Sequence, residues 1–221
     1  INFFTDENTI GTLCYSLVVA ATVTVCCTLV AYPVAYILAR SDIKKKNVLL
    51  VLFIAPMWIN FTLRVVALKE VLTMVEGNLA YHPFLNTVLG MTYDFLPFMI
   101  LPLYTTLYTT LEKLDKSYLE AAADLGASPV ITFMKVTLPL SMPGLISGVT
   151  MVFLPSMTNY VILDMLYNST YIMGSLIGSY FHAYDWNSGS MISIVLLAII
   201  FLVTWATNGF SEEETTRGAF L

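Results

Sequence analysis

The sequence predicts an all-α integral membrane protein with five transmembrane helices. Its 221 residues are 57% hydrophobic and only 11% charged, whereas soluble domains carry roughly 25% charged residues. A membrane-spanning helix needs about 20 predominantly apolar residues, and five stretches meet this requirement: 13–38, 48–68, 88–111, 143–163 and 191–208. They lack the alternation of apolar and polar residues that is typical of β-barrel strands, so we expect membrane helices.

The first predicted span is dense in small residues, which allow membrane helices to approach one another closely. It also holds the three cysteines, Cys14, Cys26 and Cys27. Their spacing suits neither a metal site nor a disulfide framework. We therefore expect them to be buried small apolar side chains.

Prolines interrupt four of the five predicted spans and leave two interpretations open. They are Pro33, Pro56, Pro97 with Pro102, and Pro155. Each removes a backbone hydrogen bond and bends its helix. Such prolines occur in membrane helices as ordinary determinants of helix shape, where neighbours satisfy the freed carbonyls. Alternatively, the bent helices line a translocation pathway whose two ends open in turn.

The distribution of Lys and Arg predicts the orientation of the chain. If the five spans alternate, eight of the ten basic residues fall on one side, and only Arg64 and Lys69 lie near the opposite one. The positive-inside rule makes the first side cytoplasmic. The N-terminus is then external, and we expect a further helix before Ile1. Residues 1–210 are expected to form one transmembrane domain, and residues 211–221 an acidic cytoplasmic tail.

The cytoplasmic loop at residues 112–139 is polar and rich in helix formers. Apolar residues at helical spacing predict a first helix that ends at Gly126, where a left-handed backbone is needed. Ser128-Pro129 is typical of the cap and first residue of a second helix. We expect Leu138-Pro139 to end that helix and Pro143-Gly144 to begin the next span. By itself, this pattern also fits a solvated amphipathic hairpin.

The composition argues against enzymatic function and nucleic-acid binding. No nucleophile–base pair, metal-ligand cluster or glycine-rich phosphate loop of the Gly-x-x-x-x-Gly-Lys-Ser/Thr type is present in the sequence. The net charge of −5 is small and scattered. We therefore expect no catalytic residue, no metal site and no cofactor bound by this chain.

The cytoplasmic loop resembles the EAA loop of type I ABC-importer permeases. Glu120-Ala121-Ala122, then Gly126 six residues after that Glu, and Leu138-Pro139 match it in residue type and spacing. The segments 96–104, 111–116 and 138–144 resemble the spermidine/putrescine permeases of the PotB type, and the resemblance covers about residues 12–205. That family normally has six spans. We expect the first of these spans to precede Ile1, and the region before Val88 to be shorter than in the relatives.

The resemblance implies a subunit of a larger machine in the bacterial inner membrane. It would pair with a PotC-like second permease above a PotA-like ATPase dimer, which holds ATP and Mg²⁺, and receive substrate from a PotD-like binding protein. The EAA loop would be the coupling helix that touches the ATPase. The residues implied in this contact are Glu120, Ala121, Ala122, Ala123, Asp124, Leu125, Gly126, Leu138 and Pro139.

A polyamine substrate would be held by carboxylates and aromatic faces, because both attract cations. The candidates are Trp58, Tyr93, Asp94, Tyr160 and Asp164. Asp94 lies deep in a span, which favours a functional role or a buried pair, whereas Asp164 could equally cap a span end. Arg64 is expected to reach outward or to pair with an acid.

Two alternatives remain for the function. The same kind of importer could carry ferric iron, sulfate, thiamine or an aminophosphonate. A secondary transporter would need coupling-ion sites and usually two related halves, and the sequence shows neither. In the outer loop, residues 172–181 could form a short helix at the membrane interface, or the aromatic residues around it could form an ordinary interfacial belt.

Overall fold

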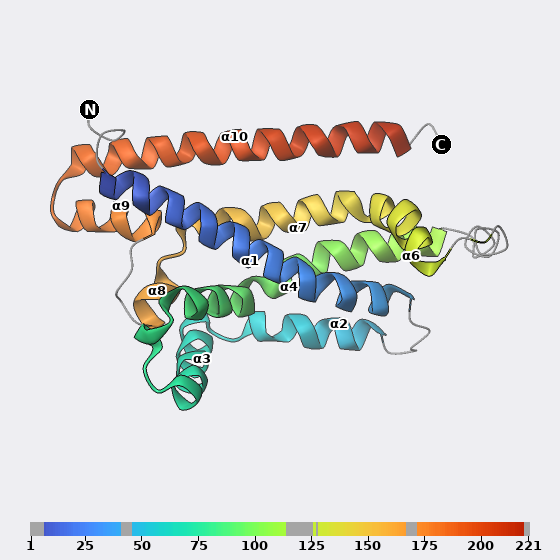
Figure 1. Cartoon of the computed structure of the whole chain (residues 1–221), viewed down its shortest axis with the longest axis horizontal. Helices are drawn as coiled ribbons and strands as arrows, with labels where there is room; N and C mark the ends of the chain where they lie inside the picture. The colour runs from blue at the N-terminus through green and yellow to red at the C-terminus, as the bar shows by residue number, and fades with distance from the viewer. Residues whose placement is uncertain (1–6, 41–45, 114–125, 127, 167–171, 219–221) are drawn as a thin grey trace.

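Helices make up the described part of the computed structural model, which covers residues 7–40, 46–113, 126, 128–166 and 172–218 and contains no strand in these ranges (Figure 1). This confirms the predicted fold class. The elements are α1 (Glu7–Arg40), α2 (Lys46–Ile54), the 3₁₀ helix η1 (Ala55–Trp58), α3 (Phe61–Glu76), the 3₁₀ helix η2 (Leu79–Tyr81), α4 (Pro83–Lys113), α6 (Pro129–Thr132), the π-helix η3 (Phe133–Thr137), α7 (Leu138–Thr158), α8 (Val161–Leu166), α9 (Met173–His182) and α10 (Trp186–Gly218).

Among the described residues, four continuous helical stretches are long and apolar enough to cross a membrane: Thr9–Arg40, Pro83–Thr109, Val130–Thr158 and Trp186–Trp205. Val48–Trp58 and Phe61–Glu76 form a fifth span if they are counted together. The two helical parts are bent by 96° relative to each other. The predicted second span, residues 48–68, is therefore bent near Pro56, one of the prolines expected to bend their helices.

The break in this second span has a local cause. Pro56 cannot donate a backbone hydrogen bond, and the chain tightens into η1 around it. Ile59 is extended, and the side chain of Asn60 accepts a hydrogen bond of 2.9 Å from the Thr62 N–H. Asn60 thus caps a new helix in a new direction.

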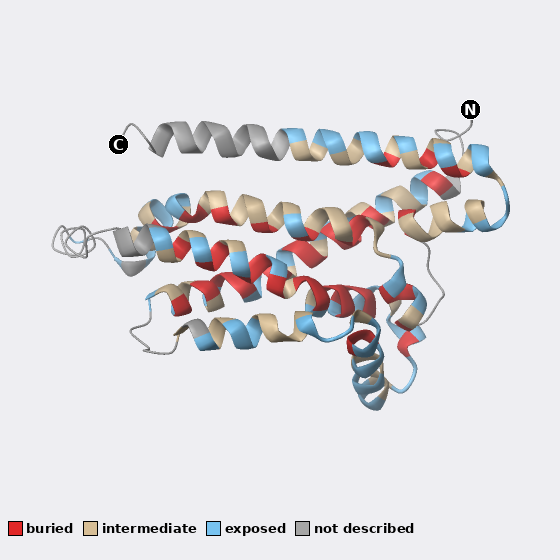
Figure 2. Cartoon of the chain, turned by 180° about the vertical axis from the view of Figure 1, so that it is seen from behind, coloured by how far each residue is buried: buried red, intermediate tan, exposed pale blue. Residues whose placement is uncertain are grey.

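The core lies where α1, α4 and α7 pack together, as the buried residues in Figure 2 show. On α1, five residues at intervals of four are fully buried: Val19, Val23, Cys27, Ala31 and Ala35. This stripe confirms close packing of the first span. Of the cysteines, Cys27 alone is buried as expected, since Cys26 is half-buried and Cys14 is exposed.

Two glycines bring α7 against α4. A Cβ at Gly144 would lie 2.5 Å from the Thr106 hydroxyl oxygen and 2.8 Å from the Pro102 carbonyl oxygen. A Cβ at Gly148 would lie 2.5 Å from the Met99 sulfur. Small residues of this kind let two membrane helices gain van der Waals contact along their backbones.

The last helix is longer than the predicted span at residues 191–208. α10 begins at Trp186 and continues to Gly218, and its part that could cross a membrane is Trp186–Trp205. The assignment of residues 211–221 to a cytoplasmic tail stays a prediction. Asp185 caps its start by accepting a 3.1 Å hydrogen bond from the Ser188 N–H. Hydrogen bonds from the side chain and backbone of Ser188 lower the pKa of Asp185.

The helix ends sort into two groups (Figure 1). The C-terminal ends of α1 and α4, the start of α2 and all of α6 lie at one end of the molecule. The starts of α1 and α10, together with α8 and α9, lie at the other. The elements that flank the basic loops therefore gather at one end, and the assignment of that end to the cytoplasm remains a prediction.

We expect Gly144→Ala to destabilise the protein by about 1–3 kcal/mol, because overpacking a close contact forces neighbouring groups to move. Thermal unfolding of the detergent-solubilised protein would measure the effect. Gly178→Ala is the matched control, since a Cβ there meets no atom within 4 Å. Equal melting temperatures for the two variants would contradict the close approach of α4 and α7.

Candidate functional site

Of the predicted coupling loop at residues 112–139, the structure describes 112–113, 126 and 128–139. Residues 120–125, which include Glu120 and Asp124, lie outside the described residues. Gly126 is exposed and has a φ of +80°. This is the left-handed region that glycine adopts without strain. Its conformation agrees with the left-handed backbone predicted at this residue.

The helix after Gly126 starts as predicted. The Ser128 side chain accepts a 3.3 Å hydrogen bond from the Ile131 N–H, and the Ser128 carbonyl accepts one of 3.0 Å from the Thr132 N–H. Pro129 occupies the first helical position, where its missing N–H leaves no partner unsatisfied.

The predicted end of this helix at Leu138-Pro139 is wrong. Residues Val130–Thr158 form one continuous helical stretch, in which α6 passes through η3 into α7. The Leu138 N–H donates to the Phe133 carbonyl, five residues back. A turn of this width gives room to the ring of Pro139, which would otherwise clash with the carbonyl four residues earlier. Pro143 is consequently inside the span and does not begin it.

The π turn is attached to α1 through aromatic rings. The ring of Phe133 packs edge-on against Tyr32 and Tyr36, with centroid distances of 5.6 and 5.9 Å. Edge-to-face pairs of this kind add to the stability gained from burial alone. A displacement of α6 would therefore also displace the part of α1 that contacts Phe133.

A buried hydrogen bond joins α1 to the start of α7, about two turns beyond Phe133. The hydroxyls of Tyr32 and Ser141 lie 2.7 Å apart. Ser141 donates its single proton to the Leu138 carbonyl at 2.8 Å, so Tyr32 is the donor and Ser141 the acceptor in this pair. The start of α7 is thus fixed to α1 by both apolar and polar contacts.

A cation–π contact ties α2 to α4 at this end of the molecule. The ammonium of Lys46 lies 4.2 Å from the centroid of the Tyr108 ring. Such contacts are worth roughly 0.5–2 kcal/mol, depending on desolvation. At the end of the bundle next to the coupling loop, noncovalent side-chain contacts therefore hold α1 to α7 and α2 to α4.

The predicted substrate residues differ in how far they are buried. Asp94 is buried, whereas Trp58, Tyr93, Tyr160 and Asp164 are exposed. The Asp164 N–H donates a 3.0 Å hydrogen bond to the Tyr160 carbonyl, but among the described residues no side-chain hydrogen bond or ring contact joins any two of the five. Asp94 instead lies against Arg64, whose Nη2 is 2.5 Å from the Asp94 Oδ1. The expectation that Arg64 reaches outward or pairs with an acid is resolved in favour of the pair.

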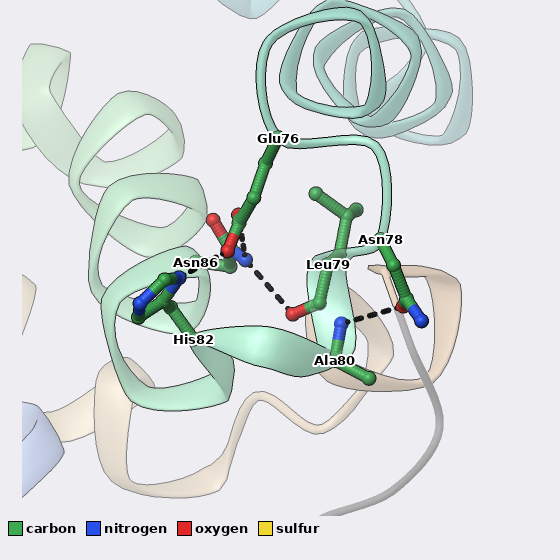
Figure 3. A network of polar contacts seen from close by, with 6 residues as sticks. All are labelled: Glu76, Asn78, Leu79, Ala80, His82 and Asn86. Carbon is green, nitrogen blue, oxygen red and sulfur yellow. Dashed lines mark hydrogen bonds and ion pairs between the residues drawn. The ribbon is translucent and has the colours of Figure 1, made fainter.

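The connection between α3 and α4 holds a polar network that the sequence analysis missed (Figure 3). Glu76 Oε1 lies 2.5 Å from Nδ1 of His82, and Glu76 Oε2 accepts a 2.7 Å hydrogen bond from the Asn86 amide. The same amide donates to the Leu79 carbonyl at 2.9 Å. In the sequence, only the pair Gly77-Asn78 indicates a turn at this position. It does not indicate which side chains form hydrogen bonds across the turn.

The short outer helix at residues 172–181 is confirmed as α9. The Met173 N–H donates a 2.9 Å hydrogen bond to the buried Ser16 hydroxyl of α1. A Cβ at Gly174 would collide with the Thr158 carbonyl oxygen, so α9 packs directly against the end of α7. Its depth in the membrane stays a prediction.

The model of the family described as "Binding-protein-dependent transport system inner membrane component" matches residues 31–211. The chain belongs to this family. The family places the chain among the permeases of ABC importers, and it confirms the resemblance found in the EAA loop.

Relatives of this inner membrane component cover most of its length. The spermidine/putrescine transport system permease protein PotB of Escherichia coli is 35% identical over 91% of this chain and 79% of its own length. The protein of that name from Haemophilus influenzae is also 35% identical, over 87% of this chain and 73% of its own. A PotB homolog from Mycoplasma pneumoniae is 33% identical over 68% of this chain and 54% of its own.

A solved structure shares the fold. A chain of the MetNI methionine ABC transporter, in an inward-facing conformation, aligns with a TM-score of 0.67 over 93% of this chain and 95% of that chain. The two are 15% identical. This likeness supports the arrangement of the inner membrane component's helices.

We expect Tyr32→Phe to destabilise this inner membrane component by about 1 kcal/mol, because a buried hydrogen bond to Ser141 is lost. Ser141 keeps its bond to Leu138, so no donor is left unsatisfied. Thermal unfolding in detergent would measure the change. Tyr36→Phe is the control, since its hydroxyl bonds to Arg40 at an exposed position. A lower melting temperature for Tyr36→Phe than for Tyr32→Phe would contradict the assigned anchor.

Proposed function

We propose that the chain is a permease subunit of an ATP-driven importer for spermidine and putrescine. The observation that carries this proposal is the 35% identity to PotB of Escherichia coli over 91% of the chain. The second PotB protein, from Haemophilus influenzae, supports it at the same level of identity. The exposed aromatic candidates and the buried carboxylate of Asp94 suit a cationic substrate.

The permease works with three kinds of partner in this proposal. A PotC-like permease completes the pore, and a PotD-like binding protein delivers the substrate from outside. A PotA-like ATPase dimer binds ATP and Mg²⁺ and carries out hydrolysis, so this chain is not itself an enzyme. The family's description as a component of binding-protein-dependent transport supports this division of labour. Membrane lipid covers the remaining apolar surface.

The EAA loop transmits the movement of the ATPase in this proposal. Glu120 contacts the ATPase on the cytoplasmic side, and Gly126 sets the turn that follows. Two features of the described residues support the role. The helical stretch from Val130 to Thr158 has no break that would absorb a displacement. Phe133 and Ser141 connect the same stretch to α1. A push on the loop would therefore move α7 and α1 together.

Reconstitution of the complete importer in liposomes tests the substrate. Spermidine or putrescine, added with the binding protein, should stimulate ATP hydrolysis and accumulate inside. Ferric iron, sulfate, thiamine and an aminophosphonate serve as comparison cargoes and should do neither. Stimulation by one of these, with none by either polyamine, would reject the polyamine assignment while leaving the importer class intact.

Substitutions in the loop test the coupling. Glu120→Arg should abolish uptake, because it reverses the charge presented to the ATPase, while membrane insertion persists. Gly126→Val should strongly reduce uptake, because a β-branched residue does not tolerate a positive φ. Gly126→Asn is the matched control, since Asn adopts this region far more readily. Normal uptake by both Glu120→Arg and Gly126→Val would disprove the coupling role of the loop.

A further inference from the structure

Arg64 and Asp94 form a buried ion pair between α3 and α4. Their exposed fractions are 8% and 4%. Arg64 lies in the first turns of α3, directly after the bend, and its N–H bonds to the carbonyl of the capping residue Asn60 at 3.2 Å. Asp94 lies near the middle of α4. Both charges have therefore been removed from water and depend on each other.

The pair is poorly satisfied for a structural contact. The Nε and Nη1 atoms of Arg64 are buried and find no acceptor among the described residues. The Asp94 Oδ1, although in contact with Nη2, accepts no aligned hydrogen bond from it. A buried pair overcomes its desolvation only when its geometry is excellent and its remaining donors are bonded.

The position of Arg64 in its helix weakens the pair further. The N-terminus of a helix carries a partial positive charge, which disfavours a nearby cation. A guanidinium close to the start of α3 therefore has no support from its own helix. Asp94 is held by a cation that is neither fully hydrogen-bonded nor favourably placed.

The backbone next to Asp94 offers a second acceptor. Pro97 has no N–H, so it cannot donate to the Tyr93 carbonyl four residues earlier in α4. A carboxylate and a freed carbonyl are thus present on adjacent residues. A primary ammonium group carries three donors, and it suits such acceptors better than a planar guanidinium does.

We propose that Asp94 binds an alkylammonium group of the transported cation and that Arg64 is the counter-ion that occupies Asp94 between transport cycles. This inference rests on the proposed uptake of polyamines. When the substrate arrives, its ammonium replaces the Arg64 guanidinium, and Arg64 swings toward the bend at residues 58–60, whose side chains are exposed. The buried carboxylate is neutralised by one cation in both states.

The exchange explains why an imperfect pair is useful. A guanidinium bonded through all its donors would hold Asp94 too firmly for a substrate to replace it. Arg64 gives up a single ion contact when it leaves, because its Nε and Nη1 have no acceptor within the described residues. In the absence of substrate, the same contact prevents an unpaired carboxylate from being buried in an apolar bundle.

The test compares the complete reconstituted importer with the double variant Arg64→Gln/Asp94→Asn. The readouts are the melting temperature and the number of spermidine molecules transported per ATP hydrolysed. The double variant removes both charges: Asn keeps the shape of Asp94, and Gln keeps a polar end on a side chain shorter than that of Arg64. No unpaired charge is left buried, so we expect a melting temperature close to that of the wild type. We expect its spermidine-to-ATP ratio to fall at least tenfold, with ATP hydrolysis still stimulated by the loaded binding protein.

A wild-type ratio in the double variant would overturn the inference, because a purely structural pair is replaceable by a neutral one. If the double variant melts well below the wild type, Asp94→Glu decides instead. It keeps the charge but displaces the carboxylate, and it should lower the ratio, whereas an unchanged ratio would again overturn the inference. If the wild-type importer itself carries neither spermidine nor putrescine, the proposed function is rejected, and this result is distinguishable from a failure of the Asp94 inference alone.

Discussion

The close contact between α4 and α7 at Gly144 and Gly148 is the constraint on which the rest of the structure depends. Lipid tails are as apolar as the side chains of a membrane helix, so burial by itself provides little driving force for helix association. Contact has to come from the fit of surfaces. The glycines allow that fit, and the buried stripe of α1 from Val19 to Ala35 completes it on the third side. The remaining elements are attached to this three-helix core.

Prolines act differently at the two ends of the core. Pro56 is followed by an extended residue and a capping asparagine, so the helix stops and restarts at 96°. Pro139 follows a π turn whose extra width accommodates its ring, so the helix continues. The first outcome produces a bend beside Arg64. The second produces an uninterrupted connection from α6, next to the proposed coupling loop, to the far end of α7.

Polar contacts hold the bent segment to the core. The network of Glu76, His82 and Asn86 closes the connection between α3 and α4, and the Arg64–Asp94 pair joins the same helices within the bundle. The network is well bonded and near the surface, whereas the pair is buried and incompletely bonded. In the proposed exchange, the Glu76 network keeps α3 attached to α4 while the substrate replaces Arg64 at Asp94.

The sequence by itself determined the features that depend on local chemistry. Apolar length predicts the membrane helices, Ser128-Pro129 predicts the start of α6, and Gly126 predicts a left-handed residue. The short helix α9 and the EAA pattern were also readable, because each resides in a few consecutive residues. A bend near Pro56 was readable as well, because proline interrupts its own helix, whereas the continuation through Pro139 was not. The partners of Phe133, Tyr32 and Asp94 emerged only in the tertiary structure. These features join residues far apart in the chain, such as Tyr32 with Ser141, and no local propensity encodes which distant side chain will lie opposite.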